Sequence, residues 1–187
     1  MDRRQRKTRE AIFKAFTDLL SEKDVQQITV GEIIDRADVG RATFYSHFET
    51  KDFLIKELCE ELFCHIGDYI GETVCNHHHI FECEDTGSAY LHLLKHLMKN
   101  DNHILKLLSC RNNEIFLRYF KTGLKDMVKR QIDIFKTEET KGLPEDFIVN
   151  HITATFVETV KWWVDNRMEQ SPEVMEQYFF KVVKRKC

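Results

Sequence analysis

The chain has 187 residues, of which 42% are hydrophobic, a net charge of −3, and only seven glycines and two prolines. This length fits one domain or two small ones sharing a core, and the near-neutral charge excludes a protein that holds nucleic acid by bulk charge alone. No hydrophobic run approaches the roughly 18 residues of a membrane span, and the N-terminus lacks the apolar core of a signal peptide. We therefore expect a soluble, cytoplasmic protein with no membrane partner.

A basic run opens the chain. The first nine residues contain one acid, Asp2, and five bases, which are Arg3, Arg4, Arg6, Lys7 and Arg9. Such a run is often no more than a solvated charge cluster. Next to an element that reads DNA, it would instead contact phosphates and orient the molecule.

Residues 8–48 predict three consecutive helices. In the first, over 8–21, apolar residues recur at the spacing of one buried stripe: Ile12, Phe16, Leu19 and Leu20. Thr29 forms a capping-box pattern with Glu32, so a second helix should start there. A third starts at Arg41, and it places Phe44 and Phe48 four residues apart on one side, where they can pack under the second.

The third helix is better suited to a DNA groove than to a core. Its other positions are polar or small: Arg41, Ala42, Thr43, Tyr45, Ser46 and His47. Arginine can bond a guanine edge, threonine can contact a base, and tyrosine, serine, histidine and lysine can bond phosphate oxygens. Lys51 follows in the first turn of a fourth helix, where its ammonium and the free amides could meet a phosphate.

The stretch from Thr29 to Lys51, with its two short helices and the turn between them, resembles the helix-turn-helix of the TetR/AcrR family of bacterial transcriptional regulators. The matching positions are Thr29, Ile33, Ala37, Val39, Thr43, Tyr45, Phe48, Lys51 and Leu54. Asp38 stands where the family has a turn glycine, and Gly40 where it has a serine cap. The alternative is a pair of ordinary packed helices. The candidate DNA-binding residues are Arg3, Arg4, Arg6, Thr29, Gly40, Arg41, Ala42, Thr43, Tyr45, Ser46, His47 and Lys51.

The resemblance also implies how the whole chain is organised. We expect an all-α fold of about nine helices, in which a three-helix DNA-binding domain over 1–50 precedes a helical bundle over 51–187. The bundle would bind a small-molecule effector and form a homodimer. A long fourth helix, starting near Thr50, would connect the two parts.

Between Gly71 and Gly87 the helical periodicity lapses, and the composition is rich in histidine and cysteine. Cys75, Cys83 and the histidines at 77–79 are ligand types for zinc or copper. Their spacing matches no closed zinc-finger pattern, so we predict no metal site and leave metal binding by this loop open. The six cysteines have no framework spacing, which is typical of reduced thiols.

The segments after Ser88 have broad apolar and aromatic faces, which would close the core of a bundle. The resemblance implies that the same helices surround an effector cavity. Its candidate lining residues are Tyr90, Leu94, Leu97, Phe116, Phe120 and Phe156. Polar side chains scattered among them, His92, His96, Asn112 and Asn113, could orient a ligand.

Two further helices are predicted over 144–167 and 171–184, the second with Ser171 as N-cap and Pro172 at its first position. The resemblance implies that both contribute to a two-fold interface. The candidate interface residues are Ile152, Phe156, Thr159, Trp163, Met175, Tyr178, Phe179 and Val182. The sequence around Trp162 and Trp163 is also similar to a subgroup that includes regulators of dihydroxyacetone kinase operons.

The function that the resemblance implies is transcriptional regulation. A dimer would bind an inverted-repeat operator, most often as a repressor, and a small-molecule effector would release it. An activator, or a regulator controlled by a protein partner, is the alternative. No glycine-rich phosphate loop, nucleophile elbow or HExxH motif is present, so we predict no enzymatic activity and no cofactor.

Overall fold

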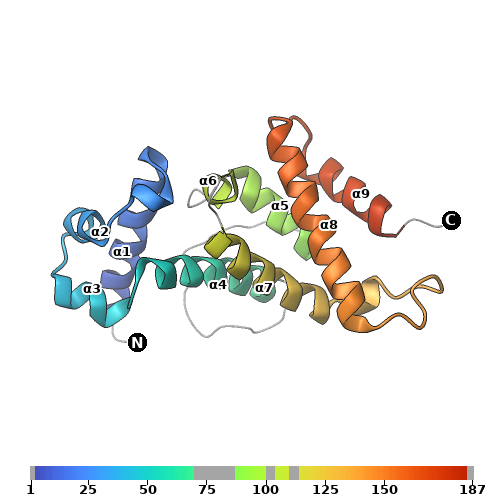
Figure 1. Cartoon of the computed structure of the whole chain (residues 1–187), viewed down its shortest axis with the longest axis horizontal. Coiled ribbons are helices and arrows are strands. Elements are labelled where there is room, and N and C mark those ends of the chain that lie inside the picture. The colour runs from blue at the N-terminus through green and yellow to red at the C-terminus, as the bar shows by residue number, and fades with distance from the viewer. Residues whose placement is uncertain (1–2, 70–86, 100–103, 110–113, 185–187) are drawn as a thin grey trace.

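Helices make up the chain in this computed structural model, which describes residues 3–69, 87–99, 104–109 and 114–184 (Figure 1). These ranges contain no strand, which confirms the predicted all-α fold of about nine helices. The α-helices are α1 (Arg3–Glu22), α2 (Val30–Ala37), α3 (Arg41–His47), α4 (Lys51–Tyr69), α5 (Ala89–Lys99), α6 (Ile104–Ser109), α7 (Glu114–Arg130), α8 (Glu145–Asp165) and α9 (Pro172–Val183). Short 3-10 turns cover Val25–Gln27 and Ile132–Ile134.

The turn between α2 and α3 follows from its local sequence. Thr29 and Glu32 form the predicted capping box, with the Thr29 amide donating to the Glu32 carboxylate at 2.9 Å. Asp38 ends α2 in the left-handed conformation, at φ 52°, which aspartate tolerates better than most residues. Gly40 is the N-cap of α3 at φ −73°, so this position does not require glycine. The chain can therefore turn without a glycine at position 38.

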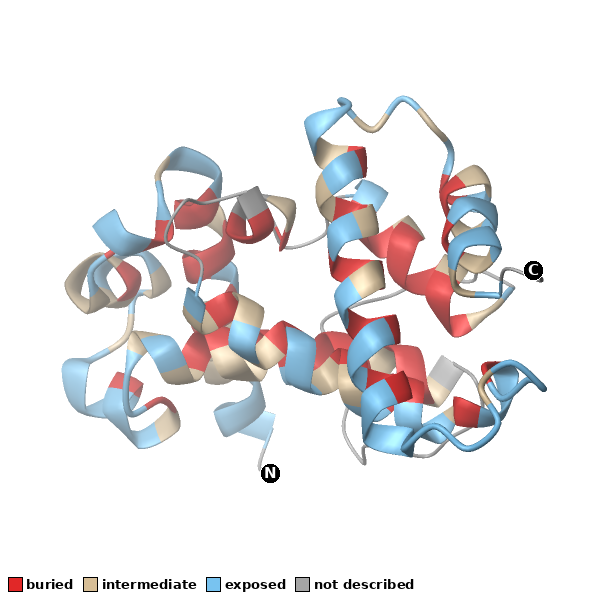
Figure 2. Cartoon of the chain, turned by 45° about the vertical axis from the view of Figure 1, so that its right-hand side comes forward, coloured by how far each residue is buried: buried red, intermediate tan, exposed pale blue. Residues whose placement is uncertain are grey.

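Aromatic side chains hold α1 and α3 together. Phe44 and Phe48 are buried, and the ring of Phe48 meets that of Phe13 on α1 edge to face at 5.3 Å. α1 begins earlier than predicted, at Arg3, so the basic run forms the first turns of a helix. The exposed residues of α1, α2 and α3 lie on their outer faces, and the buried ones lie where the helices meet (Figure 2).

α4 runs from the three-helix unit into the rest of the molecule, where it packs against α7 (Figure 1). Thr50 caps it as predicted, because its hydroxyl accepts a hydrogen bond from the Phe53 amide. Gly123 on α7 permits a close approach. A Cβ at that position would lie 2.2 Å from the ring of Phe63 on α4.

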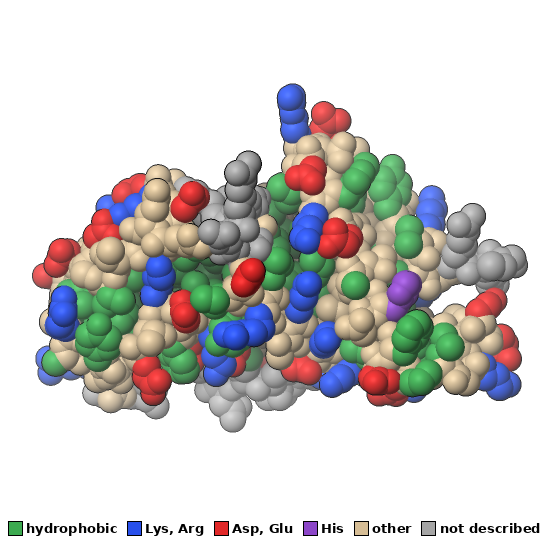
Figure 3. Space-filling model, viewed as in Figure 1, with side chains coloured by type: hydrophobic (Ala, Val, Ile, Leu, Met, Phe, Trp, Pro, Cys, Tyr) green, Lys and Arg blue, Asp and Glu red, His purple; other side chains and the backbone are tan. Residues whose placement is uncertain are grey.

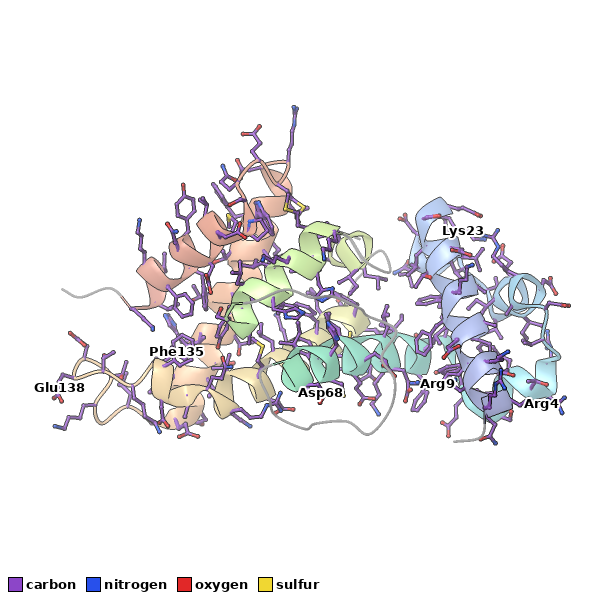
Figure 4. The ribbon with its side chains drawn as sticks, turned by 180° about the vertical axis from the view of Figure 1, so that it is seen from behind. Arg4, Arg9, Lys23, Asp68, Phe135 and Glu138 are labelled. Atoms are coloured by element: carbon purple, nitrogen blue, oxygen red, sulfur yellow. The ribbon has the colours of Figure 1, made fainter. Side chains whose placement is uncertain are left out.

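Arg9 on α1 forms ion pairs with two glutamates of α4. Its guanidinium donates to Glu61 at 2.8 Å and also to Glu57, and it lies over the ring of Phe13 (Figure 4). Burial lowers the pKa of Arg9, but the hydrogen bonds to Glu61 and Glu57 outweigh this effect and raise the pKa. Arg9 therefore acts within the structure and is not a free cation of the basic run.

The second part of the chain packs α5 against α9 and α8 against both α7 and α9. Tyr90 on α5 lies at the centre of an aromatic cluster, with ring centroids of four phenylalanines within 5.8 Å: Phe135, Phe156, Phe179 and Phe180. Ser171 accepts a hydrogen bond from the Val174 amide and Pro172 follows it, which confirms the predicted start of the last helix.

The histidine- and cysteine-rich loop lies outside the described residues. Among the described cysteines, Cys59 is a buried free thiol, and burial raises its pKa. Cys64 is disulfide-bonded, so the expectation of reduced thiols was wrong for this residue. No helix within the described ranges combines the length and the apolar character needed to cross a membrane.

Candidate nucleic-acid interface

α3 presents a polar face to solvent on the outside of the three-helix unit. Phe44 and Phe48 turn inward, and the positions between and before them point out. The exposed residues are Arg41, Ala42, Thr43, Tyr45 and Ser46, and His47 is partly exposed. The structure thus brings together on one helix six of the residues predicted to contact DNA.

The donors on this face are available for a ligand. In the described parts of the chain Arg41 forms no ion pair, whereas the nearby Arg36 is held by Glu22. Tyr45 is 47% exposed although its ring edge packs on Phe44. The Ser46 hydroxyl donates to the carbonyl of Thr43 at 2.7 Å, which leaves its oxygen as an acceptor. The face therefore offers the Arg41 guanidinium for a base edge and the Tyr45 hydroxyl as a donor to phosphate, whereas the Ser46 hydroxyl has already donated its proton.

The basic run adds charge beside this face. Arg3 and Arg4 are exposed in the first turn of α1, where Figure 4 labels Arg4. Arg6 forms an ion pair with Glu10 at 3.5 Å on the surface. Charged side chains of both signs are scattered over the face of the molecule seen in Figure 3, without a continuous basic patch. Because the net charge of the chain is −3, attraction to DNA would depend on local cations such as these and not on the overall field.

Two predicted DNA contacts have structural partners instead. The Lys51 ammonium donates to the carbonyls of Val25 at 2.7 Å and Ile28 at 2.9 Å, and burial lowers its pKa. The Thr29 hydroxyl accepts from the Glu32 amide and donates to the Glu32 carboxylate, so the capping box uses it fully. Lys51 and Thr29 therefore contribute to the framework that positions α3, and their contact with DNA stays a prediction. Gly40 is exposed and offers only its backbone.

The predicted effector-pocket residues lie in the core. All six are no more than 2% exposed: Tyr90, Leu94, Leu97, Phe116, Phe120 and Phe156. A pocket of about 370 Å³ lies elsewhere, between α4 and α7, where Phe63, Tyr119 and Arg118 line it. Of the predicted set, Phe116 lines a smaller pocket of about 220 Å³ beside Lys51. The apolar pattern marked these side chains correctly as inward-facing but could not show where space remains.

The predicted interface residues divide into two groups. Five are buried within the protomer and have little surface to offer a partner: Ile152, Phe156, Trp163, Met175 and Phe179. Tyr178 and Val182 are exposed, and Thr159 is partly exposed. Phe147 and Trp162, which are not among the candidate interface residues, are 58% and 47% exposed on α8. Trp162 and Tyr178 line a groove of about 540 Å³ between α8 and α9.

Comparisons with known proteins identify both parts of the chain. Residues 12–58 match the model of the bacterial regulatory proteins of the tetR family, and residues 84–185 match a transcriptional regulator C-terminal region. A TetR transcriptional regulator from Streptococcus agalactiae, known from its crystal structure, is 36% identical. That match covers 97% of this chain and 96% of the other, with a TM-score of 0.73.

Two curated relatives are also regulators. The uncharacterized HTH-type transcriptional regulator YxbF of Bacillus subtilis is 26% identical over 181 residues, which is 96% of this chain and 45% of the relative. The dhaKLM operon transcriptional activator DhaS of Lactococcus lactis is 34% identical over 68 residues, 34% of this chain and 36% of the relative. The chain thus spans less than half the length of YxbF, and the match to DhaS covers about a third of that relative. Together with the helix-turn-helix geometry, these matches show that the chain belongs to the TetR family of bacterial transcriptional regulators and is not an enzyme.

Proposed function

We propose that this protein is a sequence-specific regulator that binds an inverted-repeat operator as a homodimer and is released from it by a small-molecule effector. The observation that carries the proposal is the exposed face of α3, where Arg41 and Thr43 stand free of the core that Phe44 and Phe48 build. A repressor of this kind acts on chromosomal DNA, so we place it in the cytoplasm.

The case for a dimer rests on the short recognition element and on the exposed apolar surface. α3 has only seven residues, so one copy can contact only a few base pairs. Two copies related by a two-fold axis would read two half-sites and roughly double the contact free energy. The interface we now propose is the exposed strip of Trp162, Tyr178 and Val182, with Phe147 beside it, in place of the buried residues predicted from sequence.

The effector site we propose is the pocket between α4 and α7. Phe63 and Tyr119 give it apolar walls, and Lys56, Arg118 and Asp126 add charged groups at its edge, so an amphipathic small molecule would fit it. Because α4 also continues into the DNA-binding unit, a ligand that alters its packing on α7 can alter the position of α3.

An activator is the second candidate, because one relative, DhaS, is named as an activator. The sign of regulation depends on where the operator lies relative to a promoter, and both modes use the same DNA-binding face. Transcription from a reporter placed downstream of the operator, with and without the protein, separates the two.

Selection of bound sequences from a random duplex library at about 150 mM salt tests the proposal, because this salt suppresses non-specific phosphate binding. We expect enrichment of an inverted repeat. Recovery of a single half-site, or of no motif in the presence and absence of a cell metabolite extract, would contradict the proposed dimeric reader. A parallel selection with Arg41→Ala controls for enrichment that does not involve α3.

A further inference from the structure

Three histidine side chains from two helices meet at one point in the second part of the molecule. His65 lies on α4, and His92 and His96 lie on α5. The Nε2 atom of His92 is 3.2 Å from that of His65 and 2.9 Å from that of His96. His92 and His96 are each 1% exposed, and one potential ligand atom from each of the three rings lies within 4.8 Å of the others.

The helices impose this convergence. His92 and His96 are four residues apart, so they lie on the same face of α5, and their rings stack with centroids 4.8 Å apart. α4 packs against α5 and places the His65 ring edge to face against both, at 5.1 Å from His92 and 4.8 Å from His96. Neither helix alone forms the group, but their packing does.

Hydrogen bonds between the rings do not fully account for the position of the His92 Nε2 atom between the other two. A ring nitrogen carries either one proton or one in-plane lone pair, so Nε2 of His92 can make one well-directed hydrogen bond. It nevertheless faces two other Nε2 atoms at hydrogen-bonding distance. A single cation at the meeting point would satisfy all three lone pairs at once.

Two of the three separations between ligand nitrogens, those from His92 to His65 and to His96, also suit a metal ion. With zinc to nitrogen bonds of about 2.0–2.1 Å, two ligand nitrogens lie about 2.9 Å apart at a right angle and about 3.3 Å apart in a tetrahedron. The two observed separations, 2.9 and 3.2 Å, fall within this range. Three imidazoles and no thiolate are typical of zinc and its divalent neighbours, and three protein ligands leave a position for water or an oxygen donor.

We propose that His65, His92 and His96 form a binding site for a divalent transition-metal ion, with Zn²⁺ as the first candidate. The site is separate from the pocket between α4 and α7, whose lining includes none of these histidines. It also differs from the histidine-rich segment between Gly71 and Gly87, for which the sequence left metal binding open. The proposal concerns metal binding alone, so it does not depend on the proposed DNA-binding function.

Metal analysis of the full chain tests the site. Protein stripped with a chelator is equilibrated with Zn²⁺ and desalted, and the retained zinc is measured. Wild type should retain about one equivalent that depends on these histidines, whereas His65→Gln and His92→Gln should each lose it, since removing one of three ligands weakens the site strongly. Glutamine keeps most of the side-chain volume, and circular dichroism checks that both variants remain folded.

The matched control replaces His77, His78 and His79 with alanine together. This variant should keep the zinc that His65→Gln loses. Loss of all zinc in the loop variant, with full retention in His65→Gln and His92→Gln, would overturn the proposal, as would wild type that retains less than about a tenth of an equivalent.

Co²⁺ provides a test that needs no folded variant. Binding to three imidazoles in a site of low coordination number should give intense visible absorption bands, which Zn²⁺ then displaces. The weak bands of fully hydrated Co²⁺, unchanged by the wild-type protein, would contradict the site.

Discussion

Arg41 is the side chain on which sequence discrimination should depend most. It is exposed on α3 and forms no ion pair within the described residues, so its guanidinium group can donate to the edge of a guanine base. Arg41→Ala should weaken binding to the selected operator by about 1–3 kcal/mol while leaving binding to random DNA almost unchanged. Fluorescence anisotropy with both duplexes at one salt concentration measures the difference.

Arg36→Ala is the matched control for that experiment, because Arg36 lies in the same unit and its guanidinium is bonded to Glu22 at 2.5 Å. It should change specific binding less than Arg41→Ala does. Equal losses on the operator and on random DNA for Arg41→Ala would contradict the assigned role in base recognition.

Glu32 should make the DNA-binding unit sensitive to acid. Its hydrogen bonds with Lys23 and with Thr29 lower its pKa from an ordinary value of 4.5 to about 2. A carboxylate with a lowered pKa stabilises the folded state above its ordinary pKa, and this contribution is lost as the pH falls from 4.5 toward 2. The urea concentration at the unfolding midpoint should therefore fall less steeply between pH 4.5 and about pH 2 in Glu32→Gln than in wild type. Glu49→Gln, in the exposed turn before α4, is the control, and an equally reduced fall there would refute the assignment.

At the scale of single residues, the features predicted from sequence were those that neighbours along the chain determine. The capping box at Thr29, the caps at Thr50 and Ser171, and the exposed residues of α3 all depend on contacts within one turn. No local pattern indicated that the Lys51 ammonium also donates to the carbonyls of Val25 and Ile28, because those residues lie 26 and 23 positions earlier in the chain.

Two helical glycines should respond oppositely to the same substitution. Gly31→Ala in α2 brings its Cβ no closer than 3.8 Å to another group, so it should stabilise the protein by about 0.5–1 kcal/mol by restricting the unfolded chain. Gly123→Ala in α7 would place its Cβ 2.2 Å from the Phe63 ring and should destabilise it by about 1–3 kcal/mol. Urea unfolding measures both, and a stabilised Gly123→Ala would show that α4 and α7 are less closely packed.

At the scale of elements, periodicity located the helices and, in α8, the face that is buried. The spacing of Phe156, Val160 and Trp163 predicts that Trp163, and not the adjacent Trp162, points inward. The structure buries Trp163, whose indole nitrogen donates to the Gln170 carbonyl at 2.9 Å, and leaves Trp162 exposed. The pair His92 and His96 is visible in the sequence at four-residue spacing, but the addition of His65 depends on how α4 packs on α5.

For the whole molecule, the exposed strip between α8 and α9 predicts the state of assembly. Light scattering at micromolar concentration should give about twice the mass of one chain, as a two-fold dimer requires. Val182 is 65% exposed in the protomer, so Val182→Glu loses little internal packing but places a charge in the proposed interface. This variant should sediment as a monomer.

Ile134→Glu is the control for the dimer experiment, since Ile134 is 41% exposed on a different surface, in the turn between α7 and α8. It should remain a dimer. A wild-type monomer, or dissociation by both variants alike, would show that the strip between α8 and α9 is not the interface.

The way α4 is held at both ends has a mechanical consequence. Its first half is fixed to the DNA-binding unit by Lys51 and by the pairs of Arg9 with Glu57 and Glu61, and further along it lies against α7. Its 19 residues make a rod about 28 Å long. A tilt of about 5° around one end moves the other by about 2.5 Å, nearly the length of a hydrogen bond. In a symmetric pair the two displacements add, so an angular change too small to disturb the core could move both recognition helices out of step with the turns of the DNA.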